Sequence, residues 1–412
     1  MKLLILGAAG DMGSYILRDS CNQKVWSKIT IGDINEKRAF QLINELNDER
    51  VTFQFIDVLK QSELISVMQK YDLVISAIGP FYYFGPKVVK AAIEAQTPLI
   101  DICDDSGPTI EILEMDDKAK KADVPIFMGF GWTPGLTNLL VRHAYNKLDS
   151  NCPIEIDISW AGGAADSEGL AVILHVLYAV TGNFPSFQDG KMINVPAGKG
   201  NVKIDFPEPL GEVSVFDCGH PEPVTIPRYL KNIQRCTLKG GLTPDWNNKF
   251  AESMKQLHLT QGNTRKKILG KLVHLTESIF ATGGIAASSA RVDIYGTHSG
   301  KKIHWVYSTP SLEMGILTGY PASIAAKLFA EKKLDGVGII PPEAISEPEL
   351  FFEELKKRNI NLIFDEAEPL EYFKKAIPFI PSFISRYGLS LLLLSIFGLL
   401  VFILAFLFIN LI

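Results

Sequence analysis

The chain has 412 residues, with 41 Lys and Arg against 46 Asp and Glu, and 47% of its residues are hydrophobic. At about 150 residues per domain, this length predicts two or three domains with a buried core. The net charge is −5 and no run of Lys or Arg is long enough to follow a phosphate backbone, which argues against a nucleic-acid-binding protein. The five cysteines form no CxxC and the seven histidines form no HExxH. We therefore expect a reducing compartment, no disulfide scaffold and no metal site.

The first 150 residues alternate short apolar segments with amphipathic ones such as Asn35–Asp48 and Thr109–Ala122, as βαβ units do. The opening MKLLILGAAG is too short in its apolar stretch for a signal peptide and fits a buried strand. Six strands are expected: Leu3–Leu6, Ile29–Asp33, Val51–Asp57, Leu73–Ala77, Pro98–Ile102 and Pro125–Met128. This pattern predicts an α/β fold, a doubly wound parallel sheet over residues 1–150.

A glycine-rich turn follows the first strand directly and opens a helix. Gly7, Gly10 and Gly13 have the spacing G-x-x-G-x-x-G, and Asp11 and Met12 lie between the last two. This is a variant of the dinucleotide-binding fingerprint, in which the glycines permit a tight turn, a close approach of the pyrophosphate and close helix–strand packing. The free N–H groups of the helix N-terminus then face the phosphates.

Asp33 ends the second strand and is placed to accept hydrogen bonds from the ribose hydroxyls. A carboxylate there favours NAD because it repels a 2′-phosphate, whereas Lys37 and Arg38 would attract one, so NADP stays open. Two further strand ends are expected to border the cofactor or to be ordinary loops. They are Asp57 with Val58, near the adenine, and Ala77, Ile78, Gly79 and Pro80, near the nicotinamide.

Tyr83 and Lys87 match the Tyr-x-x-x-Lys pair of short-chain dehydrogenases. That pair needs a continuous helix, and Gly85-Pro86 between the two residues argues against one.

Polar residues follow the fifth and sixth strands, where ligands bind in a doubly wound sheet. Asp101, Asp104 and Asp105 are candidates to bind a substrate ammonium or to act as acid and base, although Asp104 or Asp105 could equally cap the next helix. In Gly131–Gly135, Thr133 as N-cap with Pro134 at the first helical position predicts a helix start, and Trp132 is expected to wall the nicotinamide site.

After residue 150 the pattern alternates apolar and polar residues with period two, as in Ile154–Trp160. This predicts an α+β substrate or dimerisation-type domain over residues 151–318, with an antiparallel sheet, a helix at Glu168–Thr181 and a hairpin around Ser299-Gly300.

The second domain should supply the groups that meet the substrate. His220 is a candidate for proton transfer and Arg228 for binding a carboxylate, although their segment could equally be a surface turn with a solvated Arg228. His175 lies in an apolar helix and fits a core residue better than a functional one, and His298 and His304 are expected at the surface.

Residues 319–375 are expected to return to the first domain as helices and to lead to a membrane. Residues 389–409 carry no charge and are long enough to span a bilayer. Lys374, Lys375 and Arg386 precede this span, so the positive-inside rule places the catalytic domains in the cytoplasm. The span could also support a homodimer, although its one glycine, Gly398, forms no GxxxG motif.

Together these segments resemble the saccharopine dehydrogenase-like NAD(P)-dependent oxidoreductases. The likeness is carried by Ile5–Gly13, Ala77–Tyr82, Leu99–Asp105, Gly131–Asn138 and Gly219–Pro227, with Gly319–Ala322 and Gly338–Glu343 in support. The resemblance implies a Rossmann domain, an inserted substrate domain, and hydride transfer between NAD(P) and the C–N bond of an imine or secondary amine. It implies an amino-acid or polyamine-type substrate, and the membrane span is a departure from the soluble lysine-pathway enzymes.

Two other functions remain open at this level. One is a membrane-anchored scaffold that binds a dinucleotide without catalysis. The other is a reductase of a lipid or isoprenoid substrate, which would explain the anchor. A polar junction that contains His and Arg would favour an enzyme over a scaffold.

Overall fold

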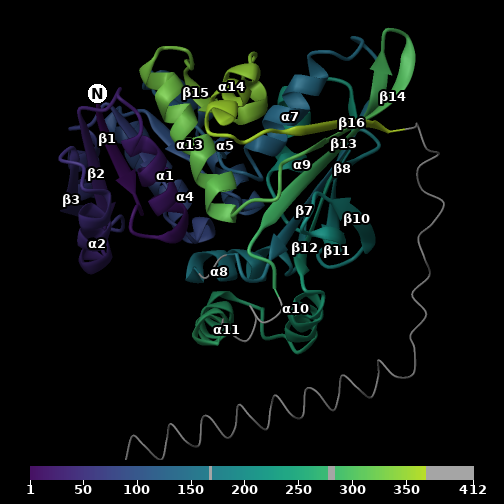
Figure 1. The fold of residues 1–412 in the computed structure, drawn as a ribbon, viewed down its shortest axis with the longest axis horizontal. Coiled ribbons are helices and arrows are strands. Elements are labelled where there is room, and N and C mark those ends of the chain that lie inside the picture. The colour runs from purple at the N-terminus through teal and green to yellow at the C-terminus, as the bar shows by residue number, and fades with distance from the viewer. Residues whose placement is uncertain (167–168, 277–283, 368–412) are drawn as a thin grey trace, which may run out of the picture. The chain divides into compact units, whose positions relative to one another are not determined.

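The first sheet of the computed structural model is parallel throughout, and six of its seven strands come from the N-terminal part of the chain (Figure 1). The structure describes residues 1–166, 169–276 and 284–367. The strands of this sheet are β1 (Lys2–Leu6), β2 (Lys28–Asp33), β3 (Val51–Phe55), β4 (Leu73–Ser76), β5 (Leu99–Asp101), β6 (Pro125–Phe127) and β15 (Gly338–Ile340). Leu3–Leu6 are all 0% exposed, as expected for a strand that is covered on both faces.

The strand order is β15-β6-β5-β4-β1-β2-β3, so the side on which the chain adds successive strands switches between β1 and β4. Ligands bind at such a switch point, beyond the carboxyl ends of the strands. The six predicted strands are confirmed within two residues at each end. β15, a three-residue strand from the distant C-terminal part, was not predicted.

Seven helices accompany the first six strands along the chain. They are α1 (Asp11–Cys21), α2 (Glu36–Leu46), α3 (Gln61–Met68), α4 (Phe81–Ala95), α5 (Ser106–Leu113), α6 (Asp116–Lys121) and α7 (Leu136–Tyr145). The single helix expected over Thr109–Ala122 is therefore wrong, because the segment divides into α5 and α6 at Glu114–Met115.

The expectation that Gly85-Pro86 prevents a helix is also wrong. α4 continues through Pro86, whose missing N–H removes only one helical hydrogen bond near the helix start. Lys87 lies over the ring of Tyr83, 4.0 Å from its centroid.

The second sheet is mixed, which corrects the expected antiparallel sheet. Its strands are β7 (Ile154–Gly163), β8 (Asn183–Gln188), β9 (Lys191–Pro196), β10 (Val202–Phe206), β11 (Gly211–Asp217), β12 (Ile233–Thr243), β13 (Ser288–His298), β14 (Lys301–Ser308) and β16 (Ile363–Ala367). β7 and β12 pair in parallel because a long crossover, residues 164–232, connects them. The alternating pattern correctly indicated strands, but it does not encode the direction of their partners.

The predicted hairpin is confirmed, with Ser299 and Gly300 between β13 and β14, both at positive φ. The expected surface position of His304 is wrong. Its ring is 3% exposed, and Nε2 lies 2.7 Å from an oxygen of Asp293 on the neighbouring strand.

The other helices of the described residues follow β7. They are α8 (Leu170–Ala179), α9 (Glu222–Tyr229), α10 (Trp246–Gln256), α11 (Asn263–Leu275), α13 (Met314–Ala330), the 3-10 turn η1 (Pro342–Ala344) and α14 (Glu349–Lys357). α8, α10 and α11 share a small apolar core that contains Leu177, Met254 and Leu269, and they lie together in the lower part of Figure 1.

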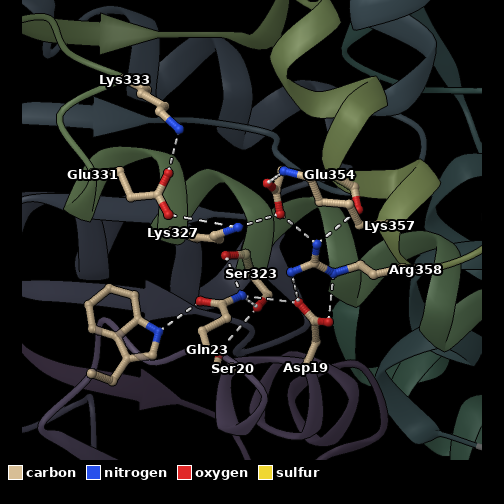
Figure 2. Close-up of polar contacts among 11 residues, drawn as sticks. Asp19, Ser20, Gln23, Ser323, Lys327, Glu331, Lys333, Glu354, Lys357 and Arg358 are labelled. Carbon is tan, nitrogen blue, oxygen red and sulfur yellow. Dashed lines mark hydrogen bonds and ion pairs between the residues drawn. The ribbon is translucent and has the colours of Figure 1, made fainter.

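A polar network joins α13 and α14 to α1 (Figure 2). Arg358 donates to both oxygens of Asp19, at 2.7 and 2.9 Å, and to Glu354. Lys327 and Lys357 also donate to Glu354. These contacts fix the C-terminal helices against the first sheet's helical layer.

The predicted membrane span, residues 389–409, lies outside the described residues. Within the part of the chain that is described, every helix is too short or too polar to cross a bilayer. Residues 359–375 were expected only to lead to the membrane, but Ile363–Ala367 form β16, which pairs with β14.

Candidate active site

The glycine loop has the geometry that a dinucleotide requires. Gly7 has φ +79°, a conformation that other residues rarely adopt. A Cβ at Gly13 would lie 2.1 Å from the carbonyl oxygen of Gly7, so only glycine lets α1 approach the loop this closely. Gly10 precedes α1 and no side chain caps that helix, which leaves its first N–H groups directed toward a ligand.

A cavity of about 640 Å³ begins at this loop and continues to α8, α10 and α11. Nine of the predicted site residues line it: Gly10, Asp11, Met12, Ala77, Gly79, Pro80, Asp104, Trp132 and His220. They come from the ends of different strands and from the segment before α9. The structure therefore brings both predicted halves of the site, cofactor loop and substrate groups, to one cavity.

The other predicted residues lie behind or beside the cavity. Gly7, Gly13 and Ile78 do not line it, although Gly13 and Ile78 adjoin lining residues in the sequence and Gly7 accepts from the N–H of Gly10. Asp57 accepts from the N–H of Leu59, and Val58 is buried, so neither faces the cavity.

Asp33 stabilises the glycine loop and the segment after β2 through hydrogen bonds to its carboxylate. Its two carboxylate oxygens accept from the N–H groups of Ala9 and Asn35, at 3.0 and 2.9 Å. Asn35, two residues further on, lines the cavity.

Arg228 is not at the cavity. It is exposed at the end of α9, and its charge acts on Asp116 and Lys120. The expectation that Arg228 binds a substrate carboxylate is therefore not retained.

Asp105 forms an ion pair with a histidine instead of capping a helix. Although Asp105 precedes α5, its side chain makes no capping hydrogen bond. One oxygen accepts from the N–H of Tyr82 at 2.9 Å, and the other lies 2.9 Å from Nδ1 of His175. An oxygen of Asp104 lies 3.2 Å from the same nitrogen.

These charges set the protonation of His175. Burial alone lowers its pKa, but Asp104 and Asp105 more than offset this and raise the pKa to about 10. Burial raises the pKa of Asp105, and His175 opposes that change. We conclude that His175 carries its positive charge at neutral pH, between two carboxylates.

His175 also meets His220, with 3.2 Å between the two Nε2 atoms. Because both nitrogens of a protonated His175 carry hydrogen, Nε2 of His220 must accept. Its Nδ1 then carries the hydrogen, and faces Glu222 at 3.6 Å. Both imidazoles line the cavity, so the shared proton lies at its wall.

Glu222 continues this chain of polar contacts into the interior. One of its oxygens accepts from Thr133 at 2.5 Å and from Thr137 at 3.0 Å. Beyond them, Asn138 donates to Glu343 at 2.9 Å. Burial raises the pKa of Glu343 to about 7.

Thr133 is thus a partner of Glu222, and its predicted role as an N-cap is wrong. The segment Gly131–Gly135 forms a tight loop closed by a bridge between its ends, and α7 begins only at Leu136. Trp132 in this loop is 4% exposed and packs edge-on against Trp160.

The far wall of the cavity is apolar. It is formed by Leu170, Ala171, Val172, Ile173, Val176, Leu177, Leu242, Phe250, Ala251, Val273 and Met314. The described lining contains neither Lys nor Arg. Lys266 on α11 lies instead over the ring of Tyr178, 4.9 Å from its centroid.

The ligand atoms of Asp104, Asp105 and His175 lie within 4.8 Å of one another, close enough to share a metal ion. A metal would need the lone pair of the His175 nitrogen that the two carboxylates hold as N–H. Metal binding at this nitrogen and the ion pair of His175 with the two carboxylates therefore exclude one another.

Sequence reasoning assigned His175 to the core and did not identify Glu222 or Glu343. The apolar helix around His175 did not indicate a functional role for this residue. Its carboxylate partner Asp105 lies 70 residues earlier in the chain, in a loop of the other sheet. Only the sequence proximity of Glu222 to His220 pointed toward it.

Comparison with known proteins agrees with this geometry. Residues 3–127 match the family model described as the saccharopine dehydrogenase NADP binding domain. Over this part, the chain is similar to the saccharopine dehydrogenase-like oxidoreductases. The resemblance seen in the sequence is thereby confirmed, whereas the preference for NAD that Asp33 suggested is not supported.

Curated relatives match the same part of the chain. A saccharopine dehydrogenase-like oxidoreductase from Rattus norvegicus is 25% identical over 166 residues, 36% of this chain and 38% of the rat protein. A lipid droplet localized protein from Caenorhabditis elegans is 24% identical over 142 residues, 32% of this chain and 33% of that protein. The matches thus span less than half of each relative.

The fold is shared over a longer region. Apo saccharopine dehydrogenase (L-Glu forming) from Saccharomyces cerevisiae superposes with a TM-score of 0.66 at 14% identity, over 89% of this chain and 100% of that chain. This similarity extends the saccharopine dehydrogenase-like architecture to the second sheet.

Proposed function

We propose that the chain is an NADP-dependent oxidoreductase that transfers a hydride to or from an apolar substrate with one polar reacting group. The observation that carries this proposal is a single cavity that joins the glycine loop, the His175–His220 pair and an apolar wall. The reacting group is a C=N or C=O bond, or the corresponding amine or alcohol.

The loop residues fit the cofactor. The N–H groups of Asp11 and Met12 would bind the pyrophosphate, and Gly79 and Pro80 would border the nicotinamide half. Lys37 and Arg38, at the start of α2, would bind the 2′-phosphate. When bound, NADPH supplies the hydride.

The two histidines would handle the proton. His175 is held protonated by Asp104 and Asp105, and its Nε2 faces the cavity beside His220. A substrate oxygen or nitrogen at this point would take the proton from Nε2 of His175. His220 and Glu222 would orient His175, which would regain its proton from water after the product leaves.

The lining favours an apolar substrate over an amino acid. A substrate with several carboxylates, such as saccharopine, needs cationic partners, and the described lining contains no Lys or Arg. An apolar amine keeps the C–N chemistry of the family, and a lipid or isoprenoid carbonyl fits the same wall. The polar histidine pair argues against the non-catalytic scaffold.

We also propose that residues 389–409 anchor the chain in a membrane, with the catalytic part in the cytoplasm. The support is their uncharged, span-length sequence and the similarity to the lipid droplet localized protein from C. elegans. Such an anchor would place the cavity near apolar substrates.

The test uses the full chain in a mild detergent. NADPH and NADH are titrated by nicotinamide fluorescence, and NADPH oxidation is then measured with detergent-dispersed long-chain ketones and imines and with polar 2-oxo acids plus amino acids. We expect tighter NADPH binding and turnover of the apolar compounds only. Failure of a folded protein to bind either dinucleotide, or turnover confined to the amino-acid mixtures, would refute the proposal.

A further inference from the structure

The hairpin formed by residues 246–275, which contains α10 and α11, has an apolar outer face. Ile268, Leu272 and Leu275 are 65%, 36% and 81% exposed. They are spaced i, i+4 and i+7, so they form one stripe along α11. Leu257 and Leu259, in the turn before α11, are 56% and 41% exposed.

The opposite face of α11 is already used in the fold. Leu269 is buried with Leu177 of α8, and Val273 packs against the same small core. α11 is therefore apolar on two faces, only one of which is covered by the described residues. A helix of this kind is expected to bury its second face against something else.

Charge indicates what that partner is. The 246–275 hairpin contains six Lys or Arg and one Glu, in a chain whose net charge is −5. Arg265, Lys267 and Lys271 are exposed on α11, beside the apolar stripe. An exposed apolar stripe flanked by basic side chains is the pattern of helices that lie in the interface of an anionic bilayer.

We propose that the 246–275 hairpin docks on an anionic phospholipid surface. Ile268, Leu272 and Leu275 enter the boundary between headgroups and acyl chains, and Arg265, Lys267 and Lys271 contact the headgroup phosphates. This goes beyond the proposed function, because lipid docking requires no catalysis. It also involves a different part of the chain from residues 389–409.

The position of α11 gives the docking a consequence for the cavity. Val273 and His274, on its inner side, line the cavity, whereas Leu272 and Leu275 are on its exposed side. A single helix, about 10 Å across, would then separate the bilayer from the apolar wall of the cavity. An apolar substrate would have a short path between the two.

The experiment measures the depth of α11 with the full chain reconstituted in vesicles. An environment-sensitive dye is attached at Leu275→Cys in a Cys21→Ser, Cys152→Ser background, and quenching by lipids with brominated acyl chains is recorded. The matched control carries the dye at Phe55→Cys, since Phe55 is also exposed, at 58%, but lies on β3. Vesicles of phosphatidylcholine with phosphatidylserine are compared with phosphatidylcholine alone.

We expect strong quenching of the dye at 275 in the anionic vesicles and none at 55. The double variant Lys267→Glu, Lys271→Glu should lower the quenching at least about twofold, as should high salt. Equal quenching at both positions, or none at 275, would overturn the proposal. A dimer that Ile268→Ser dissociates, together with no quenching, would show that a second copy covers this face.

Discussion

The Nε2 atoms of His175 and His220 lie 3.2 Å apart, although 45 residues separate them in the chain. One histidine comes from α8 and the other from the segment that leads into α9. Asp105, from a loop of the first sheet, contacts Nδ1 of His175, and Glu222 faces Nδ1 of His220. The contact of His175 with Asp105 therefore depends on how the two sheets' connecting segments pack together.

The first prediction concerns this pair. His175→Gln or His220→Gln should lower kcat about 10²- to 10⁴-fold, because each removes a partner of the transferred proton. The dissociation constant for NADPH should stay the same, since the glycine loop is untouched. Single-turnover NADPH oxidation and fluorescence titration measure the two quantities.

His298→Gln is the matched control, because His298 is exposed and binds only the carbonyl of Lys147 among the described contacts of its ring nitrogens. It should have wild-type kcat. Equal loss of rate in all three variants would show that the effect is not specific to the cavity.

The second prediction concerns the charge on His175. The charges of Asp104 and Asp105 raise its pKa from 6.5 to about 10 despite burial. Asp105→Asn removes one charge, so the pKa should fall by about one unit or more. The alkaline limb of the pH–rate profile should then move to lower pH, without a change in NADPH affinity. An unmoved limb would mean that another group titrates.

Stability should follow the same titration. Because the pKa of His175 is higher in the folded than in the unfolded chain, its contribution is fully present below pH 6.5 and is lost as the pH rises through 10. Thermal unfolding of the wild type should therefore show this loss between pH 6.5 and 10. In Asp105→Asn the same loss should be smaller.

The third prediction concerns the 2′-phosphate. Lys37→Ala and Arg38→Ala should each weaken NADPH binding about tenfold and leave NADH binding unchanged, since only NADPH has the phosphate. Arg18→Ala is the control, because Arg18, like Arg38, pairs with Glu45 but lies on α1. If NADH and NADPH weaken equally, the effect lies in α2 and not in phosphate recognition.

Local patterns predicted the first sheet well because they encode burial and turn geometry directly. The run at Leu3–Leu6 is buried on both faces, and Gly7 has the positive φ that its place after a strand requires. The hairpin at Ser299-Gly300 follows from the same kind of signal. In each case the information lies within a few residues.

The site was predicted only in part, because its side chains are defined by distant partners. His175 lies in an apolar sequence context, and its contact with Asp105, 70 residues away, is what distinguishes it from a core residue. Arg228 is close to His220 in sequence, yet it lies at the exposed end of α9. The mixed strand directions of the second sheet were not predicted for the same reason, since the parallel pairing of β7 with β12 is not a local property of the sequence.

The fourth prediction tests how the C-terminal helices are fixed to α1. The side chains of Arg358 and Asp19 are 14% and 4% exposed, so Arg358→Ala would leave a buried carboxylate without its main partner. We expect a loss of about 2–4 kcal/mol in the free energy of unfolding, measured by urea denaturation. Lys333→Ala is the control within the same network (Figure 2), since the Lys333–Glu331 pair is largely exposed and should contribute little.

Glu354 makes the stability that this network provides depend on pH in the acid range. Burial raises its pKa, but hydrogen bonds from Lys327, Lys357 and Arg358 lower it to about 2, from 4.5. Because the folded-state pKa is the lower one, the stabilisation is present above pH 4.5 and is lost as the pH falls toward 2. The wild type should therefore lose stability in that range faster than Glu354→Gln, and equal slopes would show that other carboxylates control unfolding in acid.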